Sequence, residues 1–331
     1  MKLFHKLLAV IFFFGCVACS RSYSQAAPQT EPVELQLQVS TPFHFVAYGD
    51  ARFHDPKDKE AANPAVRQAL VKAIAEANPA FISFGGDIVY NGDDKDDWKV
   101  WDSETAVWRE KKITVYPALG NHDLHGNEKV ALANYFERFP DLKNSRYYSV
   151  RAANTLVLTL DSSQEETSGP QGQWLTQKLD HLPGDVDFVV LVLHHPPYTS
   201  SSDTKIFGGG HSARSEEQKL AKVLEGRQQN QRARFVVFSG HVHNYERHEH
   251  GGVTYIVTGG AGAHAYPVER AKDDPFQSKE VNYHYMMVDV DRGTLKITMH
   301  RLELNNGTAV WTEPDSVNIS VPAAKEAAQG K

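Results

Sequence analysis

The sequence predicts an α/β fold, and two observations support this expectation. Apolar strand-like runs alternate with amphipathic helix-like runs between residues 43 and 241, and a polar cluster follows most of the strand-like runs. In open α/β sheets, binding residues gather at the carboxyl ends of the strands, because the loops there can vary while the strands fix their roots. After residue 251 short alternating strands follow one another without helices, which predicts an antiparallel half packed on the first.

The elements can be assigned in order along the chain. In the first βαβ unit, Val66, Leu70, Ala73 and Ile74 share one face of an amphipathic helix between two buried strands. Two tryptophans, Trp101 and Trp108, lie a heptad apart in a second helix, and we expect them to pack in the core. Helices are expected at residues 63–77, 91–112, 172–182 and 216–226, and strands at 43–49, 80–86, 113–120, 155–162, 187–195, 233–241, 252–260, 283–291 and 294–304.

The N-terminus predicts export. Residues 1–19 combine a basic start with an apolar run and small residues, which is typical of a signal peptide rather than a transmembrane helix. Cys19 lies in a sequence that resembles a lipobox, so acylation of this cysteine and plain cleavage near Ala26 or Ala27 are both open. The expected location is the periplasm or cell envelope, and the only expected contact with a membrane is a lipid anchor at the N-terminus.

The folded domain is expected at residues 42–313. Residues 20–41 are polar and contain prolines, which suits a linker, and residues 314–331 read as a flexible C-terminal tail. Both cysteines precede the linker, so the domain has no disulfide. The net charge of −6 leaves no basic surplus for a phosphate backbone, so nucleic-acid binding is not expected. The sequence does not identify a protein partner.

The polar clusters together contain the donors of a metal centre. Oxygen and imidazole donors without a thiolate exclude iron-sulfur and soft-metal sites and favour Fe, Mn, Zn, Co or Ni. Seven candidates are too many for one ion with about four to six positions, but they suit two ions that share a carboxylate, for which Asp87 is the natural bridge. The candidate ligands are Asp50, Asp87, Tyr90, Asn121, His194, His241 and His243.

The order of these motifs resembles a known signature. An early GD, a second GD, GNHD, a histidine before proline and GHVH follow one another over about residues 43–300. This order is similar to that of the calcineurin-like metallophosphoesterases. The resemblance implies a four-layer αββα sandwich of two mixed β-sheets flanked by helices. It also implies hydrolysis of a small phosphate ester by a metal-bound hydroxide.

The first two clusters narrow the resemblance. Many members of the superfamily carry a histidine two residues after the first aspartate, where this chain has Arg52. GDIVY places Tyr90 three residues after Asp87, similar to the GDxxY motif of purple acid phosphatases, in which the tyrosine takes the vacant position. With so few residues before its first strand, the chain resembles the single-domain form of that family.

The second resemblance implies two different metal ions. Fe(III) would be held by Asp50, Asp87, Tyr90 and His243, and a divalent ion (Fe, Zn or Mn) by Asp87, Asn121, His194 and His241. A ferric ion suits a phenolate ligand because a strongly charged ion displaces the phenol proton near neutral pH. The alternative is that Tyr90 only packs behind the buried strand.

Four further residues are candidates for substrate binding and catalysis. The resemblance implies that His122 contacts the phosphate and helps the leaving group depart, and Asp123 is expected to orient His122 by accepting its second N–H. His195 is a second candidate acid. Arg52 either binds phosphate oxygens bidentately or is an exposed loop charge. His211, His248, His250 and His264 are expected on the surface.

The leading functional hypothesis is a phosphomonoesterase of the acid phosphatase type. Two alternatives stay open. One is a phosphodiesterase of the same fold acting on nucleotides or phospholipid headgroups, because the metal motifs are shared between the two activities. The other is a non-catalytic surface binding protein whose metal centre has lapsed, although the complete ligand set argues against it.

Overall fold

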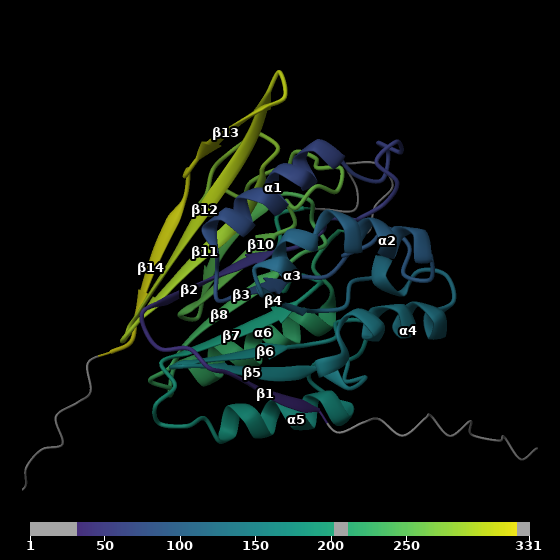
Figure 1. Ribbon diagram of the computed structural model, residues 1–331. Coiled ribbons are helices and arrows are strands. Elements are labelled where there is room, and N and C mark those ends of the chain that lie inside the picture. Colours follow the sequence, from purple (N-terminus) through teal and green to yellow (C-terminus); the bar gives the residue numbers. More distant parts are fainter. Residues whose placement is uncertain (1–31, 202–210, 323–331) are drawn as a thin grey trace, which may run out of the picture.

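Two mixed β-sheets packed face to face, with helices on their outer faces, form the molecule (Figure 1). The computed structural model describes residues 32–201 and 211–322. The expected four-layer αββα sandwich is confirmed. The export signal, the acylation site and the end of the tail lie outside the described residues.

Sheet A has seven strands and is parallel at its centre, where β6, β7, β8 and β10 run side by side in the same direction. Its buried strands are short apolar runs such as FVVLVL, as expected for a parallel sheet that is covered on both faces. In spatial order the strands are β1 (Val33–Leu37), β5 (Tyr148–Ala152), β6 (Thr155–Thr159), β7 (Phe188–Leu193), β8 (Arg234–Ser239), β10 (Val253–Thr258) and β9 (Tyr245–His250).

Sheet B also has seven strands, of which the parallel trio β2, β3 and β4 carries the first polar clusters. Its other part is antiparallel and is built on the long strand β12, which pairs with β13 at one end and β14 at the other. The strands are β13 (Thr308–Thr312), β12 (Thr294–Asn305), β11 (Tyr283–Asp291), β2 (Phe43–Tyr48), β3 (Phe81–Phe84), β4 (Thr114–Pro117) and β14 (Ser316–Ser320).

The helices cover the outer faces of the sheets. Asn63 caps the first helix by accepting a hydrogen bond from Val66 N, and a proline occupies its first turn, which together explain why it begins there. Helices α1 (Pro64–Ala77), α2 (Lys95–Glu104), α3 (Ala106–Glu110) and α4 (Glu128–Arg138) lie on the sheet B side, and α5 (Gly169–Asp180) and α6 (Ser215–Gln228) lie on sheet A.

The main core lies between the sheets. Phe45 of β2 stacks on Phe81 of β3 at 4.6 Å between ring centroids and meets the edge of Phe238 of β8 across the interface at 6.4 Å. A second cluster fills the space between sheet A and helices α5 and α6. Trp101 and Trp108 are buried in the main core, as the sequence predicts.

Several sequence expectations require correction. Residues 33–37 form β1, and residues 316–320 form β14, although they were expected in the linker and the tail. Both strands are short and alternate apolar with polar residues, so their partners β5 and β12 decide their structure rather than their own hydrophobicity. The expected antiparallel half is also not a single unit, because β10 joins sheet A while β11 and β12 join sheet B.

The predicted helix at residues 91–112 is two shorter helices. The first helix, α2, is capped at its start by Asp94, whose side chain accepts a hydrogen bond from Asp96 N. Thr105 is the residue directly after its end. The Thr105 hydroxyl donates to the Trp101 carbonyl at 2.6 Å. This side chain thus provides a hydrogen-bond partner for a carbonyl of the last helical turn. Helices α2 and α3 therefore meet at Thr105, with Trp101 and Trp108 on either side.

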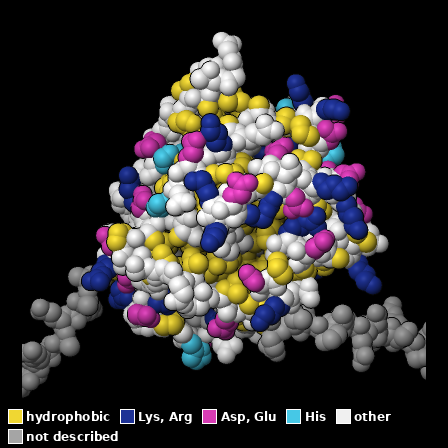
Figure 2. All heavy atoms as spheres, viewed as in Figure 1, with side chains coloured by type: hydrophobic (Ala, Val, Ile, Leu, Met, Phe, Trp, Pro, Cys, Tyr) yellow, Lys and Arg dark blue, Asp and Glu magenta, His cyan; other side chains and the backbone are white. Residues whose placement is uncertain are grey.

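The surface visible in Figure 2 carries interspersed basic and acidic side chains rather than a patch of one sign. Mixed charge is typical of the surface of a soluble domain. Within the described ranges, no helix has the length and apolar character needed to cross a bilayer.

Candidate metal centre

The candidate ligands converge at the edge where the two sheets meet. Asp50, Asp87 and Asn121 follow β2, β3 and β4 of sheet B, whereas His194 and His241 follow β7 and β8 of sheet A. Backbone hydrogen bonds join these ends, for example from Gly240 N to the His194 carbonyl and from Asp50 N to the Gly86 carbonyl. Residues nearly two hundred positions apart thus share one site because parallel strands end together.

The backbone at this edge is strained. Asp50, Arg52, Asp87 and His241 all have positive φ, at 65°, 46°, 53° and 70°. Residues other than glycine rarely adopt this backbone conformation, and each such residue costs on the order of 1–3 kcal/mol of folding free energy. Three of these four residues are candidate ligands and the fourth, Arg52, contacts Asp87, as is typical of a preorganised site.

Two glycines permit the close approach of these turns. A Cβ atom at Gly240 would lie 2.3 Å from Asp50 Oδ2, and one at Gly120 would lie 2.2 Å from Asp87 N. The glycines of the GH and GN motifs are therefore required by packing against the two aspartates.

Asp50, Asp87 and His243 form what we call the carboxylate half of the centre. One ligand atom from each lies within 4.8 Å of the others, and all three side chains are buried. His243 Nδ1 donates to the His264 carbonyl at 2.9 Å, which leaves the Nε2 lone pair facing Asp50 Oδ1 at 3.6 Å.

Asn121, His194 and His241 form the imidazole half. His194 Nδ1 donates to the Gly85 carbonyl at 2.9 Å, so Nε2 carries the lone pair that can bind a metal ion. Asn121 Oδ1 lies 3.0 Å from His194 Nε2 and 3.1 Å from His241 Nδ1, and these two nitrogens are 3.2 Å apart. Three neutral donors thus point at one another, as around a cation.

Asp87 lies between the halves. Its Oδ1 is 3.4 Å from His194 Nε2, while its Oδ2 accepts hydrogen bonds from Arg52. Burial alone would raise its pKa, but neighbouring His194 and Arg52 hold the pKa of Asp87 well below its ordinary value. Burial, together with the charge of Asp87, raises the pKa of Asp50 well above its usual range.

The residues fit a two-ion centre. His243 Nε2 is buried and has no hydrogen-bond partner among the described residues, which is costly unless a ligand satisfies it. A cation between Asp50 and Asp87 would also remove the penalty of two buried carboxylates side by side. The His243 Nε2 atom therefore fits the role of a metal ligand.

Tyr90 lies between two histidines in a row of aromatic rings. Its ring centroid lies 5.0 Å from that of His54 and 5.2 Å from that of His122. His122 Nδ1 donates to the Tyr90 carbonyl at 2.7 Å, which leaves Nε2 for a substrate. Burial lowers the pKa of His122 to about 4, so a bound phosphate must raise it before the imidazole can serve as an acid.

The expected role of Asp123 is wrong. Its Oδ1 accepts from Ile88 N at 2.8 Å and Val89 N at 3.2 Å, and its Oδ2 accepts from Gly120 N at 2.9 Å. The buried side chain therefore stabilises the turn after Asp87, while a backbone carbonyl orients His122. The physical reason is that two peptide N–H groups of this turn and that of Gly120, after β4, need an acceptor.

His195 lies against the imidazole half. Its ring centroid is 4.4 Å from that of His241, and its ligand atom groups with those of His194 and His241. Ser162 Oγ accepts from His195 N at 3.1 Å and also lies within hydrogen-bond distance of Nδ1, at 2.8 Å. Burial lowers the pKa of His195, which disfavours the role of acid and favours a neutral donor.

Two residues near the site were missed by the sequence interpretation. His211, expected on the surface, lies with its ring 4.9 Å from His241 and 5.2 Å from Tyr266. The Tyr266 hydroxyl accepts from His243 N at 3.3 Å. The only sequence signal was that His211 directly follows three glycines in a run that comes after the histidine strand.

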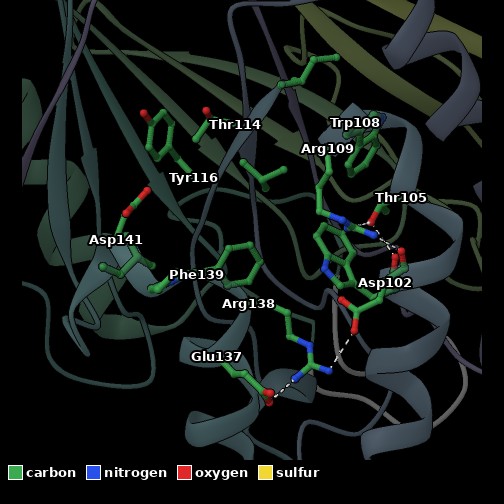
Figure 3. A pocket seen from close by; sticks show the side chains of 15 residues that line it. Asp102, Thr105, Trp108, Arg109, Thr114, Tyr116, Glu137, Arg138, Phe139 and Asp141 are labelled. Atoms are coloured by element: carbon green, nitrogen blue, oxygen red, sulfur yellow. Dashed lines mark hydrogen bonds and ion pairs between the residues drawn. The ribbon is translucent and has the colours of Figure 1, made fainter. Parts of the chain in front are cut away.

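A cavity of about 440 Å³ lies elsewhere, between helices α2, α3 and α4 (Figure 3). Trp101 is part of its wall and also contacts Phe53, the neighbour of Arg52, with ring centroids 5.1 Å apart. Arg138 crosses its mouth to Asp102 at 3.0 Å. None of the predicted site residues is among its described lining residues, so the cavity is separate from the metal centre.

Solved structures share this fold. Purple acid phosphatase PPD1 from yellow lupin (Lupinus luteus) seeds is 16% identical with a TM-score of 0.60, and the match covers 87% of this chain and 58% of the lupin chain. Plasmodium GAP50, described as the anchor in the inner membrane complex, is 16% identical with a TM-score of 0.58, covering 86% of this chain and 90% of its own. PhoD is 12% identical with a TM-score of 0.60, covering 86% and 70%.

At these identities the structural likeness establishes the fold, and the chain spans little more than half of the lupin protein. The family model described as calcineurin-like phosphoesterase matches residues 44–245, the segment that contains every candidate metal ligand. This chain belongs to the calcineurin-like phosphoesterase family.

Proposed function

We propose that this protein is a metal-dependent phosphoric ester hydrolase of the acid phosphomonoesterase type. The observation that supports it most is the pair of donor groups at the meeting edge of the two sheets, with Asp87 contacting both. Two bound cations would neutralise the oxygens of a phosphoryl group and activate a water for attack. The substrate class is a small phosphate ester.

The residues of the chain have separate tasks in this proposal. Asp50, Asp87 and His243 would hold one cation, and Asn121, His194 and His241 would hold the other, with Asp87 between them. The His122 imidazole, oriented by the Tyr90 carbonyl at 2.7 Å, would contact the phosphate through Nε2 and support the departing alkoxide. The backbone strain at Asp50 and Asp87 holds the carboxylates in place before the substrate arrives.

A substrate comparison tests this function. We expect the protein reconstituted with Mn²⁺, Zn²⁺ or iron to hydrolyse p-nitrophenyl phosphate faster than bis-p-nitrophenyl phosphate at acid to neutral pH. Asn121→Ala and His241→Ala should abolish turnover and lose one ion by mass spectrometry. His181→Ala, which changes an exposed histidine directly after α5, is the control and should keep the wild-type rate. Wild-type rates in the first two variants would contradict the assignment, and faster diester cleavage would favour the phosphodiesterase.

We further propose that the carboxylate half holds Fe(III) with Tyr90 as its phenolate ligand. This proposal rests on the GDxxY motif and on the position of the Tyr90 ring beside His122. The iron-loaded protein should show a visible charge-transfer band that disappears in Tyr90→Phe, with His54→Phe as a control that keeps the band. A colourless and fully active iron-free protein would contradict it.

Export to the periplasm or cell envelope, with or without acylation of Cys19, belongs to the same proposal. Cell fractionation of the wild type and of Cys19→Ser distinguishes a lipid anchor from plain cleavage.

A non-catalytic role is the second candidate, because GAP50, described as an anchor, shares this fold over 90% of its length. The fully loaded protein decides between the two: binding of two metal ions without hydrolysis of either ester would favour the binding role.

A further inference from the structure

Arg52 contacts the carboxylate that the two halves of the centre share. Its Nη2 lies 3.1 Å and its Nε 3.3 Å from the same oxygen, Asp87 Oδ2. The Asp87 side chain is fully buried and that of Arg52 is 14% exposed. The guanidinium therefore sits inside the polar interior, on an oxygen that a metal ion of the carboxylate half would need.

The backbone fixes this contact. Arg52 has a φ of 46°, and its N–H donates to the Asp87 carbonyl at 3.0 Å. Its own carbonyl accepts at 3.1 Å from Arg67, a buried side chain that also binds Glu104 with two hydrogen bonds of 2.8 Å. These bonds fix the backbone of Arg52 beside Asp87, so the side chain starts next to the shared carboxylate.

The imidazole half has a different composition. Its donors Asn121, His194 and His241 are neutral and lie 3.0–3.2 Å from one another. A cation entering there gains nitrogen and oxygen donors without displacing the guanidinium from Asp87 Oδ2. A cation entering the carboxylate half must either displace the guanidinium or share Asp87 Oδ2 with it. Two positive charges bound to the same carboxylate oxygen repel strongly.

We propose that Arg52 is a built-in competitor of the metal ion at the carboxylate half, so that the two halves bind metal with unequal affinity and the imidazole half fills first. This inference rests on the proposed two-ion centre but does not depend on turnover. Arg52 acts through Asp87 and is thus a residue that sets metal affinity, not a catalytic residue.

Calorimetric titration of metal-free full-length protein with Mn²⁺ alone tests the proposal, with bound metal counted by mass spectrometry. The wild type should bind one ion tightly and a second more weakly. Arg52→Ala and Arg52→Gln should tighten the second step about tenfold or more and leave the first unchanged, because a positive charge no longer competes with the metal ion for Asp87. Arg52→Lys keeps the charge and should keep the weak step.

Two further variants identify the halves. His243→Ala should remove the weak step, and Asn121→Ala should remove the tight one. Arg247→Ala is the matched control, because Arg247 is also 14% exposed and binds Asp315 through Nε at 2.8 Å and Nη2 at 3.0 Å, away from the ligands. It should leave both steps unchanged.

The outcomes separate this inference from the proposed hydrolase. Equal affinities in the wild type, or a second step that stays as weak in Arg52→Gln as in the wild type, would overturn the inference. If Arg52→Ala loses its near-ultraviolet circular dichroism, Arg52→Gln and Arg52→Lys decide, since they differ in charge at similar size. Absence of ester hydrolysis by the loaded protein would overturn the function and leave the measured affinities standing.

Discussion

The two halves of the centre are supported in different ways. The carboxylate half is supported by a buried ion pair between Arg67 and Glu104. The Arg67 guanidinium also donates to the carbonyls of Arg52 and His54. Behind the imidazole half stands Ser162, whose hydroxyl binds His195 and whose carbonyl accepts from Arg214 at 2.5 Å.

This difference follows from the charge of the ligands. Two adjacent carboxylates need compensating cations even without metal, and Arg52 and Arg67 supply rigid positive charge at that side. Neutral imidazoles need only orientation, which carbonyls and a hydroxyl provide. The lesson is that a two-ion centre of this kind contains one half organised by charge and one organised by hydrogen-bond direction.

The largest expected effect is that of Asp87→Asn, which removes the charge that both halves use. Metal content should fall for both ions, and turnover should fall by about a hundredfold or more, the upper end for loss of a group that holds metal ligands. Mass spectrometry and p-nitrophenyl phosphate turnover measure the two effects. If only one ion is lost, Asp87 does not link the halves and the comparison above fails.

Arg67→Met should have the next largest effect, on stability. The substitution leaves Glu104, which is 11% exposed, without its partner, and breaking a buried ion pair costs about 3–5 kcal/mol of the free energy of unfolding. Urea unfolding measures the loss. The double variant Arg67→Met with Glu104→Leu is the control, because it removes both charges and should recover much of the loss. A single variant as stable as the wild type would show that the carboxylate half needs no such support.

The last expected effect concerns Glu166, which lies 4.0 Å from Arg214, the residue that binds the Ser162 carbonyl beside the imidazole half. Burial, with the charge of Glu217, raises the pKa of Glu166 to about 8 from its ordinary 4.5. Between these values the folded state holds a proton that the unfolded state lacks, so stability falls as pH rises, by at most about 1.4 kcal/mol per pH unit, and the loss is complete above pH 8.

Glu166→Gln should therefore flatten the decline in unfolding free energy between pH 5 and pH 8 in urea titrations. Glu165→Gln, the exposed neighbour, is the matched control and should keep the wild-type slope. Equal slopes in all three proteins would show that Glu166 does not keep its proton and that the support of the imidazole half is not acid-sensitive.

Much of the fold could be predicted because local signals agreed with the final packing. Helix α1 carries its cap at Asn63, a proline in its first turn and an inward face at Val66, Leu70 and Ile74, so sequence and structure coincide. Strands β1 and β14 lack such signals, because each alternates apolar with polar residues over only five positions, and their pairing to β5 and β12 and the packing of their apolar side chains on the core are tertiary contacts.

The candidate ligands could be identified from the sequence for a related reason. Carboxylates, amides and imidazoles that follow apolar strands must meet when the strands end at one edge, and glycines such as Gly120 and Gly240 mark where the turns approach closely. The sequence by itself therefore determined the fold class, the candidate donors for two metal ions and the departure at Arg52, since each depends on residue type and order along the chain.

Only the tertiary structure decided which contacts these side chains make. Asp123 binds peptide N–H groups instead of His122, Arg52 binds Asp87, and His211 reaches His241 from a distant loop. Such contacts depend on directions and distances between segments far apart in the chain. A change of a few ångströms exchanges one hydrogen-bond partner for another without altering any sequence motif, so motif and spacing cannot specify them.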